Sequence, residues 1–150
     1  MKRRMEKRLD GDVTIVDDIA HSPEKAKSVL KNLRSIYSGK IIAVFEPNIG
    51  NRTEQSKPSY DNAFKDANEV IIPRLSKTKV DEKNPQMSFD GEELAQTIVK
   101  THTKSMCIEN DEKLVAYLKE NVKKGDCVAF LGSHGFRGMI EDAVKKLASV

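Results

Sequence analysis

The strand, turn and helix that decide the fold read Val13-Thr14-Ile15-Val16-Asp17-Asp18-Ile19-Ala20-His21-Ser22-Pro23. The four residues before the two aspartates are apolar or β-branched, which is typical of a short buried strand. Ser22 is a residue type that caps helices, and Pro23 suits the first helical position because its missing N–H is not needed there. The stretch therefore predicts a strand that passes directly into a helix. The apolar face of that helix would carry Ala26, Val29, Leu30 and Leu33.

The same alternation continues along the chain. Apolar runs predict further strands at residues 40–45, 70–72, 105–108 and 126–131. Between and after them, apolar residues recur at helical spacing, on faces formed by Tyr60, Ala63, Phe64 and Ala67, by Leu94, Ile98 and Val99, by Leu114, Val115, Leu118 and Val122, and by Ile140, Ala143, Val144 and Leu147. Fully apolar strands separated by helices predict an α/β, Rossmann-like fold with an open, mostly parallel sheet and helices on both faces.

Helix caps and one long loop complete the expected organisation. Asp90 with Glu93 is expected to cap the third helix, and Asn110 or Asp111 the fourth. Residues 74–88 form a polar stretch without periodicity, which predicts a long loop. Residues 1–10 are expected to be the end of an interdomain linker, and residues 11–150 a single domain.

Composition excludes several classes of protein. The basic start is not followed by an apolar stretch, so it is not a secretory signal, and no run approaches the ~20 apolar residues of a membrane helix. The net charge is only +3 and acidic residues interrupt the lysines, which disfavours nucleic-acid binding. Cys107 and Cys127 lie in apolar runs, which predicts free thiols in a reducing cytosol. With three histidines and no CxxC motif, a zinc site is not expected.

Polar residues follow every predicted strand. In open α/β sheets, ligands bind beyond the carboxyl ends of the strands. The residues at those positions are Asp17, Asp18 and His21, then Glu46, Pro47, Asn48 and Arg52, then Arg74, then Glu109, then Gly132, Ser133, His134 and Gly135. We therefore expect groups from distant parts of the chain to converge on one edge.

Each of these groups has more than one interpretation. Asp17 and Asp18 should point in different directions. One of them binds sugar hydroxyls or a cation, or, alternatively, one of them caps a helix N-terminus. His21 either contacts a ligand or is a surface histidine, and Arg52 either binds a carboxylate or phosphate or is solvated. The glycine-rich turn from Gly132 either cradles an anion or only permits tight packing. A phosphoacceptor receiver domain is excluded, because the strand ends lack its acceptor Asp and its Lys.

Four motifs resemble one family in order and spacing. The segment from Asp17 to Pro23 resembles the D-[YF]-[AG]-H-x-P turn that opens the C-terminal domain of the Mur ligases, which are ATP-dependent ligases of peptidoglycan precursor synthesis. Residues 2–6 resemble the Arg-Arg segment that leads into that domain, residues 42–47 its second strand with a Phe-x-Pro exit, and residues 130–139 its final strand and turn. The resemblance covers the chain from Lys2 to the last helix.

Within the family, two motifs resemble the muropeptide-recycling branch most. These are Phe45-Glu46-Pro47 and Gly135-Phe136-Arg137-Gly138. That branch joins UDP-N-acetylmuramate to the tripeptide L-alanyl-γ-D-glutamyl-meso-diaminopimelate. The next most similar branch adds L-alanine and typically reads Phe-Gln-Pro-His-Arg, where this chain has Asn48-Ile49 after the proline. The amine donor is therefore left open.

The resemblance implies a shared site. ATP and Mg²⁺ would be bound mainly by a central domain, while this domain closes over the nucleotide and binds the amine substrate. On the nucleotide side, Asp18, with Asp17 as the alternative, would bind the ribose, His21 would line the cleft, and Arg3 or Arg4 would approach the phosphates. On the substrate side, Arg52 would meet a carboxylate, and the group would also include Asn48, Asn51, Ser133 and His134.

One motif is absent from the sequence. The chain has no GxxxxGK[ST] phosphate-binding loop, so we expect the isolated chain to be inactive. In the longer enzyme, the partners would be a UDP-N-acetylmuramate-type substrate and an amino acid or peptide, in the bacterial cytoplasm, without nucleic acid or membrane. The alternatives are the matching domain of a folylpolyglutamate synthetase and a stand-alone nucleotide- or peptide-binding module.

Overall fold

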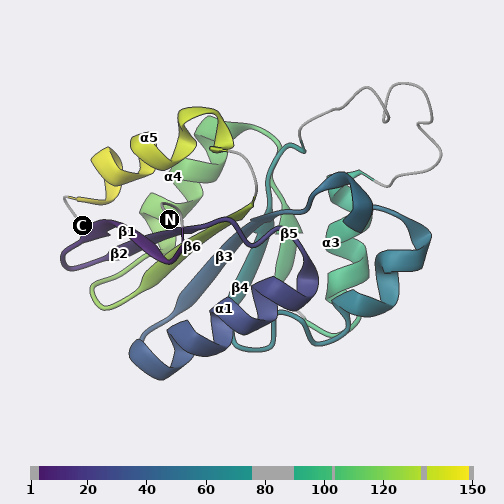
Figure 1. Ribbon diagram of the computed structural model, residues 1–150. Coiled ribbons are helices and arrows are strands. Elements are labelled where there is room, and N and C mark those ends of the chain that lie inside the picture. Colours follow the sequence, from purple (N-terminus) through teal and green to yellow (C-terminus); the bar gives the residue numbers. More distant parts are fainter. Residues whose placement is uncertain (1–3, 76–89, 103, 133–134, 149–150) are drawn as a thin grey trace.

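The chain folds around a six-stranded sheet with the strand order β1-β2-β6-β3-β4-β5 (Figure 1). The computed structural model describes residues 4–75, 90–102, 104–132 and 135–148, except for the side chain of Ile49. The strands are β1 (Glu6–Asp10), β2 (Thr14–Asp18), β3 (Ile41–Glu46), β4 (Glu69–Ile72), β5 (Ser105–Cys107) and β6 (Cys127–Gly132). Among the described strands, β1 alone runs antiparallel to its neighbour, so the predicted mostly parallel sheet is confirmed.

Helices cover both faces of the sheet, as predicted. The α-helices are α1 (Pro23–Ile36), α3 (Gly91–Val99), α4 (Asp111–Asn121) and α5 (Met139–Leu147), and the short 3₁₀ helices are η1 (Ile49–Asn51), η2 (Glu54–Tyr60) and η3 (Phe136–Gly138). One buried cluster joins the sheet to α1, η2 and α3, and the other joins it to α4 and α5 (Figure 1). In β6, Ala129 and Leu131 belong to the first cluster and Val128 and Phe130 to the second, which explains its unbroken apolar run.

The predicted helix starts are also confirmed. Ser22 accepts a hydrogen bond from the backbone N–H of Lys25 at 3.3 Å, with Pro23 as the first helical residue. Asp90 accepts one from the N–H of Glu93 at 2.8 Å. Asn110, rather than Asp111, caps α4 by accepting from the N–H of Lys113 at 2.9 Å.

Strand β1 was not predicted, because its sequence, Glu-Lys-Arg-Leu-Asp, lacks an apolar run. It lies at the edge of the sheet and pairs with β2, with Glu6 opposite Asp17 and Asp10 opposite Thr14. An edge strand does not need to be buried on both of its faces. Charged residues on it discourage pairing with the strands of other chains. The expectation that residues 1–10 end a linker stays a prediction, but half of that segment belongs to the sheet.

The predicted helix around Tyr60 is wrong in type. Helix η2 ends at Tyr60, and residues 61–66 form turns, with i→i+3 hydrogen bonds such as Ala63 N–H to Tyr60 O at 3.2 Å. Pro58 within η2 and the left-handed Asn62 (φ 59°) are incompatible with a continuous α-helix. The four side chains expected on its face, Tyr60, Ala63, Phe64 and Ala67, are nevertheless all buried. Most of the predicted loop 74–88 lies outside the described residues.

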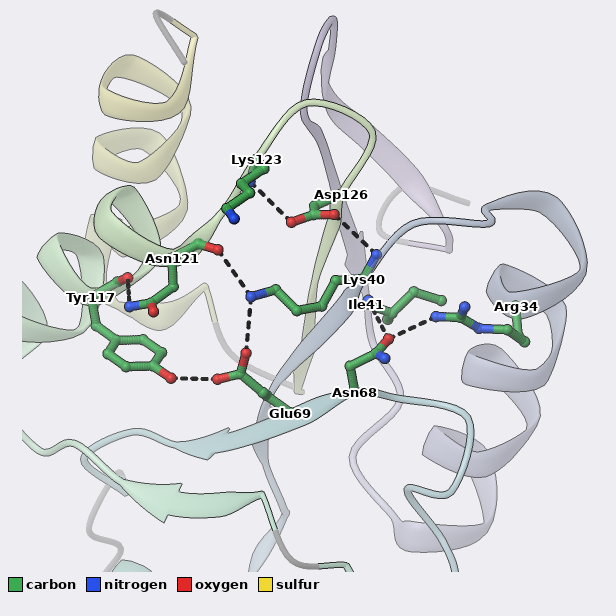
Figure 2. A network of polar contacts seen from close by, with 9 residues as sticks. All are labelled: Arg34, Lys40, Ile41, Asn68, Glu69, Tyr117, Asn121, Lys123 and Asp126. Atoms are coloured by element: carbon green, nitrogen blue, oxygen red, sulfur yellow. Dashed lines mark hydrogen bonds and ion pairs between the residues drawn. The ribbon is translucent and has the colours of Figure 1, made fainter.

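A polar network lies at the edge of the sheet where the parallel strands begin. Lys40 lies at its centre (Figure 2). Its ammonium is 3.1 Å from Glu69 and 2.9 Å from the carbonyl oxygen of Asn121. Tyr117 of α4 donates its hydroxyl proton to Glu69, and the Lys40 N–H donates to Asp126 at 3.0 Å. These bonds tie α4 to β3, β4 and the start of β6 at the edge away from the predicted site.

Candidate functional site at the carboxyl edge

The two aspartates at the end of β2 point to opposite faces of the sheet and have different partners. Asp17 is 1% exposed and lies 3.3 Å from the guanidinium of Arg8, which also contacts Glu141 of α5 at 3.1 Å. Asp18 faces the α1 side and accepts two backbone hydrogen bonds of 2.8 Å, one from Met5 and one from Ala20. Asp18 therefore joins the incoming chain to the turn between β2 and α1.

A surface pocket of about 380 Å³ lies beside Asp18. It is lined by Arg4, Met5, Asp18, Ile19, Ala20, Lys25, Ser28, Val29 and Asn32. Its wall combines apolar side chains with one carboxylate, two cations and two hydrogen-bonding side chains. Such a pocket suits a ligand with an apolar part, hydroxyl groups and a negative charge. Asp18 and Arg4, both predicted on the nucleotide side, are thus brought together.

The exits of β2 and β3 meet directly. The backbone N–H of Asn48 donates to the carbonyl oxygen of His21 at 3.1 Å. The Nδ1 atom of His21 lies 2.8 Å from the carbonyl oxygen of Ile19, and because a carbonyl only accepts, Nδ1 carries the proton. His21 is half-buried between the two exits. The predicted convergence of these two strand ends is therefore present.

Arg52 is buried, at 4% exposure, and its guanidinium turns inward. Its Nε and Nη2 atoms donate to the carbonyl oxygen of Pro47 at 3.1 and 2.9 Å, and Nη2 lies 3.6 Å from Glu46. In the same loop, Asn51 donates its side-chain amide to Asn48 and its N–H to the Asn48 carbonyl oxygen at 3.0 Å. These partners differ from the substrate carboxylate that the resemblance implies for Arg52.

A second charged group at this edge combines Arg74, which the strand ends predict here, with Arg137 and Asp111, which were not predicted as site residues. Arg137 donates to Asp111 from Nε at 3.2 Å and from Nη2 at 2.9 Å, and Arg74 lies 3.9 Å from the same carboxylate. From the sequence, Asp111 is expected only as a possible helix cap, and Arg137 only as part of the Gly135–Gly138 motif. Their contact joins residues far apart in the sequence, so the only available signal was the position of each after a predicted strand.

Other predicted groups are placed as follows. Arg3, Ser133 and His134 lie outside the described residues, and Glu109 is exposed. Cys107 and Cys127 are free thiols, as predicted, and burial raises their pKa values to about 11 and about 12. Within the described ranges, no group of three or more His, Cys, Asp or Glu side chains could hold a metal ion. None of the helices described is long and apolar enough to cross a membrane.

An open, mostly parallel α/β sheet with helices on both faces and a pocket at the carboxyl end of β2 defines a Rossmann-like domain. The family described as "Mur ligase, glutamate ligase domain" matches residues 3–134. The chain belongs to this family. The predicted resemblance is thus confirmed over nearly the whole chain.

Sequence relatives agree with this assignment. The chain is 32% identical over 146 residues to the UDP-N-acetylmuramate–L-alanine ligase of Brachyspira hyodysenteriae, covering 97% of this chain and 31% of the relative. It is 34% identical over 133 residues to the enzyme of the same name from Persephonella marina, covering 87% of this chain and 28% of the relative. The chain therefore spans about three tenths of the length of these relatives.

Solved structures show the same fold at low identity. The murein peptide ligase Mpl of Psychrobacter arcticus superposes with a TM-score of 0.79 at 17% identity, over 99% of this chain and 30% of that one. A domain of a putative UDP-N-acetylmuramate:tripeptide ligase from Haemophilus ducreyi gives 0.67 at 20%, over 96% of this chain and 99% of that one. A folylpolyglutamate synthase/dihydrofolate synthase from Yersinia pestis gives 0.61 at 13%, over 97% and 31%.

Proposed function

We propose that this chain is the C-terminal domain of an ATP-dependent ligase that joins UDP-N-acetylmuramate to an amino acid or a peptide. The observation that carries the proposal is the pocket formed by Arg4, Asp18 and Lys25 in a chain whose family match covers residues 3–134. The alanine ligases among its relatives favour a UDP-sugar over a folate substrate. The domain of the folylpolyglutamate enzyme supports the alternative in fold alone.

On the nucleotide side, Asp18 would accept hydrogen bonds from ribose hydroxyls. A carboxylate has about four lone-pair positions, and two backbone N–H groups use only two of those of Asp18. Asp17 suits this role less, because it lies on the other face of the sheet and is nearly inaccessible. Arg4, which is exposed at the pocket, or Arg3 would approach the phosphates, and His21 would line the cleft.

On the amine side, Asn48, Asn51, Ser133 and His134 would contact the amino acid or peptide. ATP with Mg²⁺, held mainly by another domain, would activate the carboxylate of the sugar substrate for attack by the amine. Closure of this domain would exclude water from the activated carboxylate, which water would otherwise hydrolyse. The residues described here would thus bind and orient ligands rather than carry the phosphoryl chemistry.

The proposal is tested by comparing this chain with the polypeptide that its gene encodes. The chain alone should show no ATP-dependent amide ligation. A polypeptide that also contains the region encoded upstream of Met1 should release ADP when UDP-N-acetylmuramate and an amine are both supplied. Comparing L-alanine with L-alanyl-γ-D-glutamyl-meso-diaminopimelate as the amine separates the two branches. Ligation by the chain alone, or an upstream region without a P-loop domain, would overturn the proposal.

A further inference from the structure

One peptide unit at the carboxyl edge is held from both of its ends. The carbonyl oxygen of Pro47 and the N–H of Asn48 belong to the same planar peptide group. The guanidinium of Arg52 donates twice to that carbonyl oxygen, at 3.1 and 2.9 Å. On the other side, the N–H donates to the carbonyl oxygen of His21 at 3.1 Å. Because the group is planar, fixing its oxygen also fixes the direction of its N–H.

The burial of Arg52 makes this hold specific. A buried charge is unfavourable unless it is paired and hydrogen-bonded. Arg52 is 4% exposed and Glu46, its partner at 3.6 Å, is 1% exposed, so the guanidinium has little freedom to turn away. A lysine could keep the charge near Glu46, but it could not place two donors of one rigid plane on the same oxygen.

Tyr60 holds the same segment from a second point. Its hydroxyl donates to the carbonyl oxygen of Asn51 at 2.6 Å, and the N–H of Asn51 donates to the carbonyl oxygen of Asn48 at 3.0 Å. Burial raises the pKa of Tyr60, so the hydroxyl remains a donor over the whole neutral range. Its ring is fixed by an edge contact with Phe45, with centroids 6.2 Å apart.

We propose that Arg52 is a positioning residue that acts through the Pro47–Asn48 peptide on His21. By this route it fixes the β2–α1 turn (residues 19–22) relative to the β3 exit loop (residues 47–53). The two loops then form one unit, which joins the nucleotide side to the amine-substrate side. The identity of these two ligand sides rests on the proposed function, whereas the coupling between the loops does not.

The test uses the chain without ligand, by amide hydrogen exchange and amide chemical shifts in solution. Arg52→Lys and Tyr60→Phe are compared with Arg34→Lys, a control at the opposite edge, where Arg34 donates to the Gly39 carbonyl oxygen and to Asn68. In Arg52→Lys, the Asn48 amide should exchange about tenfold faster, since one constraining contact is lost. The amide shifts of His21 and Ser22, in the other loop, should move as well.

Tyr60→Phe should accelerate exchange at Asn51 and Asn48 without affecting the interior of β3, and Arg34→Lys should leave both loops unchanged. The proposal is overturned if Arg52→Lys changes only residues 46–53, or if exchange rises uniformly along the chain, because Arg52 would then act on local or global stability alone. Because no nucleotide is present, failure here leaves the proposed ligase function intact, and failure of nucleotide binding leaves this coupling intact.

Discussion

Arg137 forms a two-point hydrogen-bonded pair with Asp111 while its own backbone lies in the left-handed region, at φ 55° and ψ 37°. The preceding residue, Phe136, is also left-handed, at φ 58°, and is fully buried against Phe130 with ring centroids 5.4 Å apart. Two consecutive non-glycine residues in this region are unfavourable by about 1–2 kcal/mol each. The pair with Asp111 and the burial of Phe136 thus hold a strained turn at the ligand edge.

This strain can be measured at Arg137. Arg137→Ala and Arg137→Gly both remove the pair with Asp111, but only glycine tolerates the left-handed backbone. We expect the glycine variant to be about 1 kcal/mol more stable than the alanine variant in urea unfolding. The exposed pair itself contributes only about 0.2–1 kcal/mol. Equal stabilities for the two variants would show that the turn is not strained at this position.

The ion pair of Arg8 with the buried Asp17 predicts a contrast within β1. Arg8→Ala should lower the free energy of unfolding, because it removes a partner of a carboxylate that is 1% exposed. The matched control is Lys7→Ala, since among the described residues Lys7 forms an ion pair with Asp10 alone, at 3.6 Å, and both side chains are more than half exposed. We expect a loss of about 1–3 kcal/mol for Arg8→Ala and under about 0.5 kcal/mol for Lys7→Ala. Similar losses would argue against a stabilising role for the buried pair.

The polar network at the opposite edge predicts an acid dependence. Burial alone would raise the pKa of Glu69, but the hydrogen bond from Tyr117 and the contact with Lys40 outweigh it and lower the pKa. The resulting stability is present above the unfolded pKa of Glu69 and is lost as the pH falls through its folded pKa. Tyr117→Phe should therefore destabilise the chain by about 1 kcal/mol at neutral pH and by less in acid. If the difference in the free energy of unfolding between Tyr117→Phe and the parent chain stayed constant down to pH ~3, this interpretation would be contradicted.

The hydrogen bond between Tyr117 and Glu69 also predicts how the stability of the chain changes at alkaline pH. Burial, with the hydrogen bond to Glu69 and its charge, raises the pKa of Tyr117 to about 12. Because the neutral hydroxyl is the stabilised form, its contribution is complete below the unfolded pKa of about 10 and is lost as the pH rises through the folded value. Absorbance titration should show one tyrosine ionising near the folded value, and this transition should be missing from Tyr117→Phe. If Tyr117 instead ionised at pH ~10, Glu69 would not be stabilising its neutral hydroxyl.

The sheet was predictable because most of its strands are buried on both faces. Their apolar runs, such as residues 126–131, have no other stable location, and the helix caps follow from the chemistry of Ser22, Asp90 and Asn110. Strand β1 escaped prediction because its place depends on pairing with β2, not on its own hydrophobicity. The turns after Tyr60 were not predicted, because an apolar pattern at helical spacing does not reveal the left-handed backbone of Asn62.

The site was predictable as a location but not in its contacts. Strand ends alone placed Asp18, His21 and Asn48 at one edge, and the structure brings the last two into contact. A charged residue in a polar loop gives no sign of burial, so the inward turn of Arg52 depends on Glu46 and Pro47 and becomes visible only in three dimensions. The Arg137–Asp111 pair likewise depends on the approach of two helix starts.

The most direct test of the account is an ADP titration of the 150-residue chain followed by amide NMR. We predict shifts at residues 17–21 and around Arg4, with a dissociation constant of ~1 mM, about 4 kcal/mol, because most nucleotide contacts would come from another domain. Asp18→Asn should weaken this binding, and Asp12→Asn, the same charge change at the other end of β2, should not. Shifts confined to the opposite edge around Lys40 and Asp126, or equal binding by both variants, would contradict the assignment of Asp18 to the nucleotide.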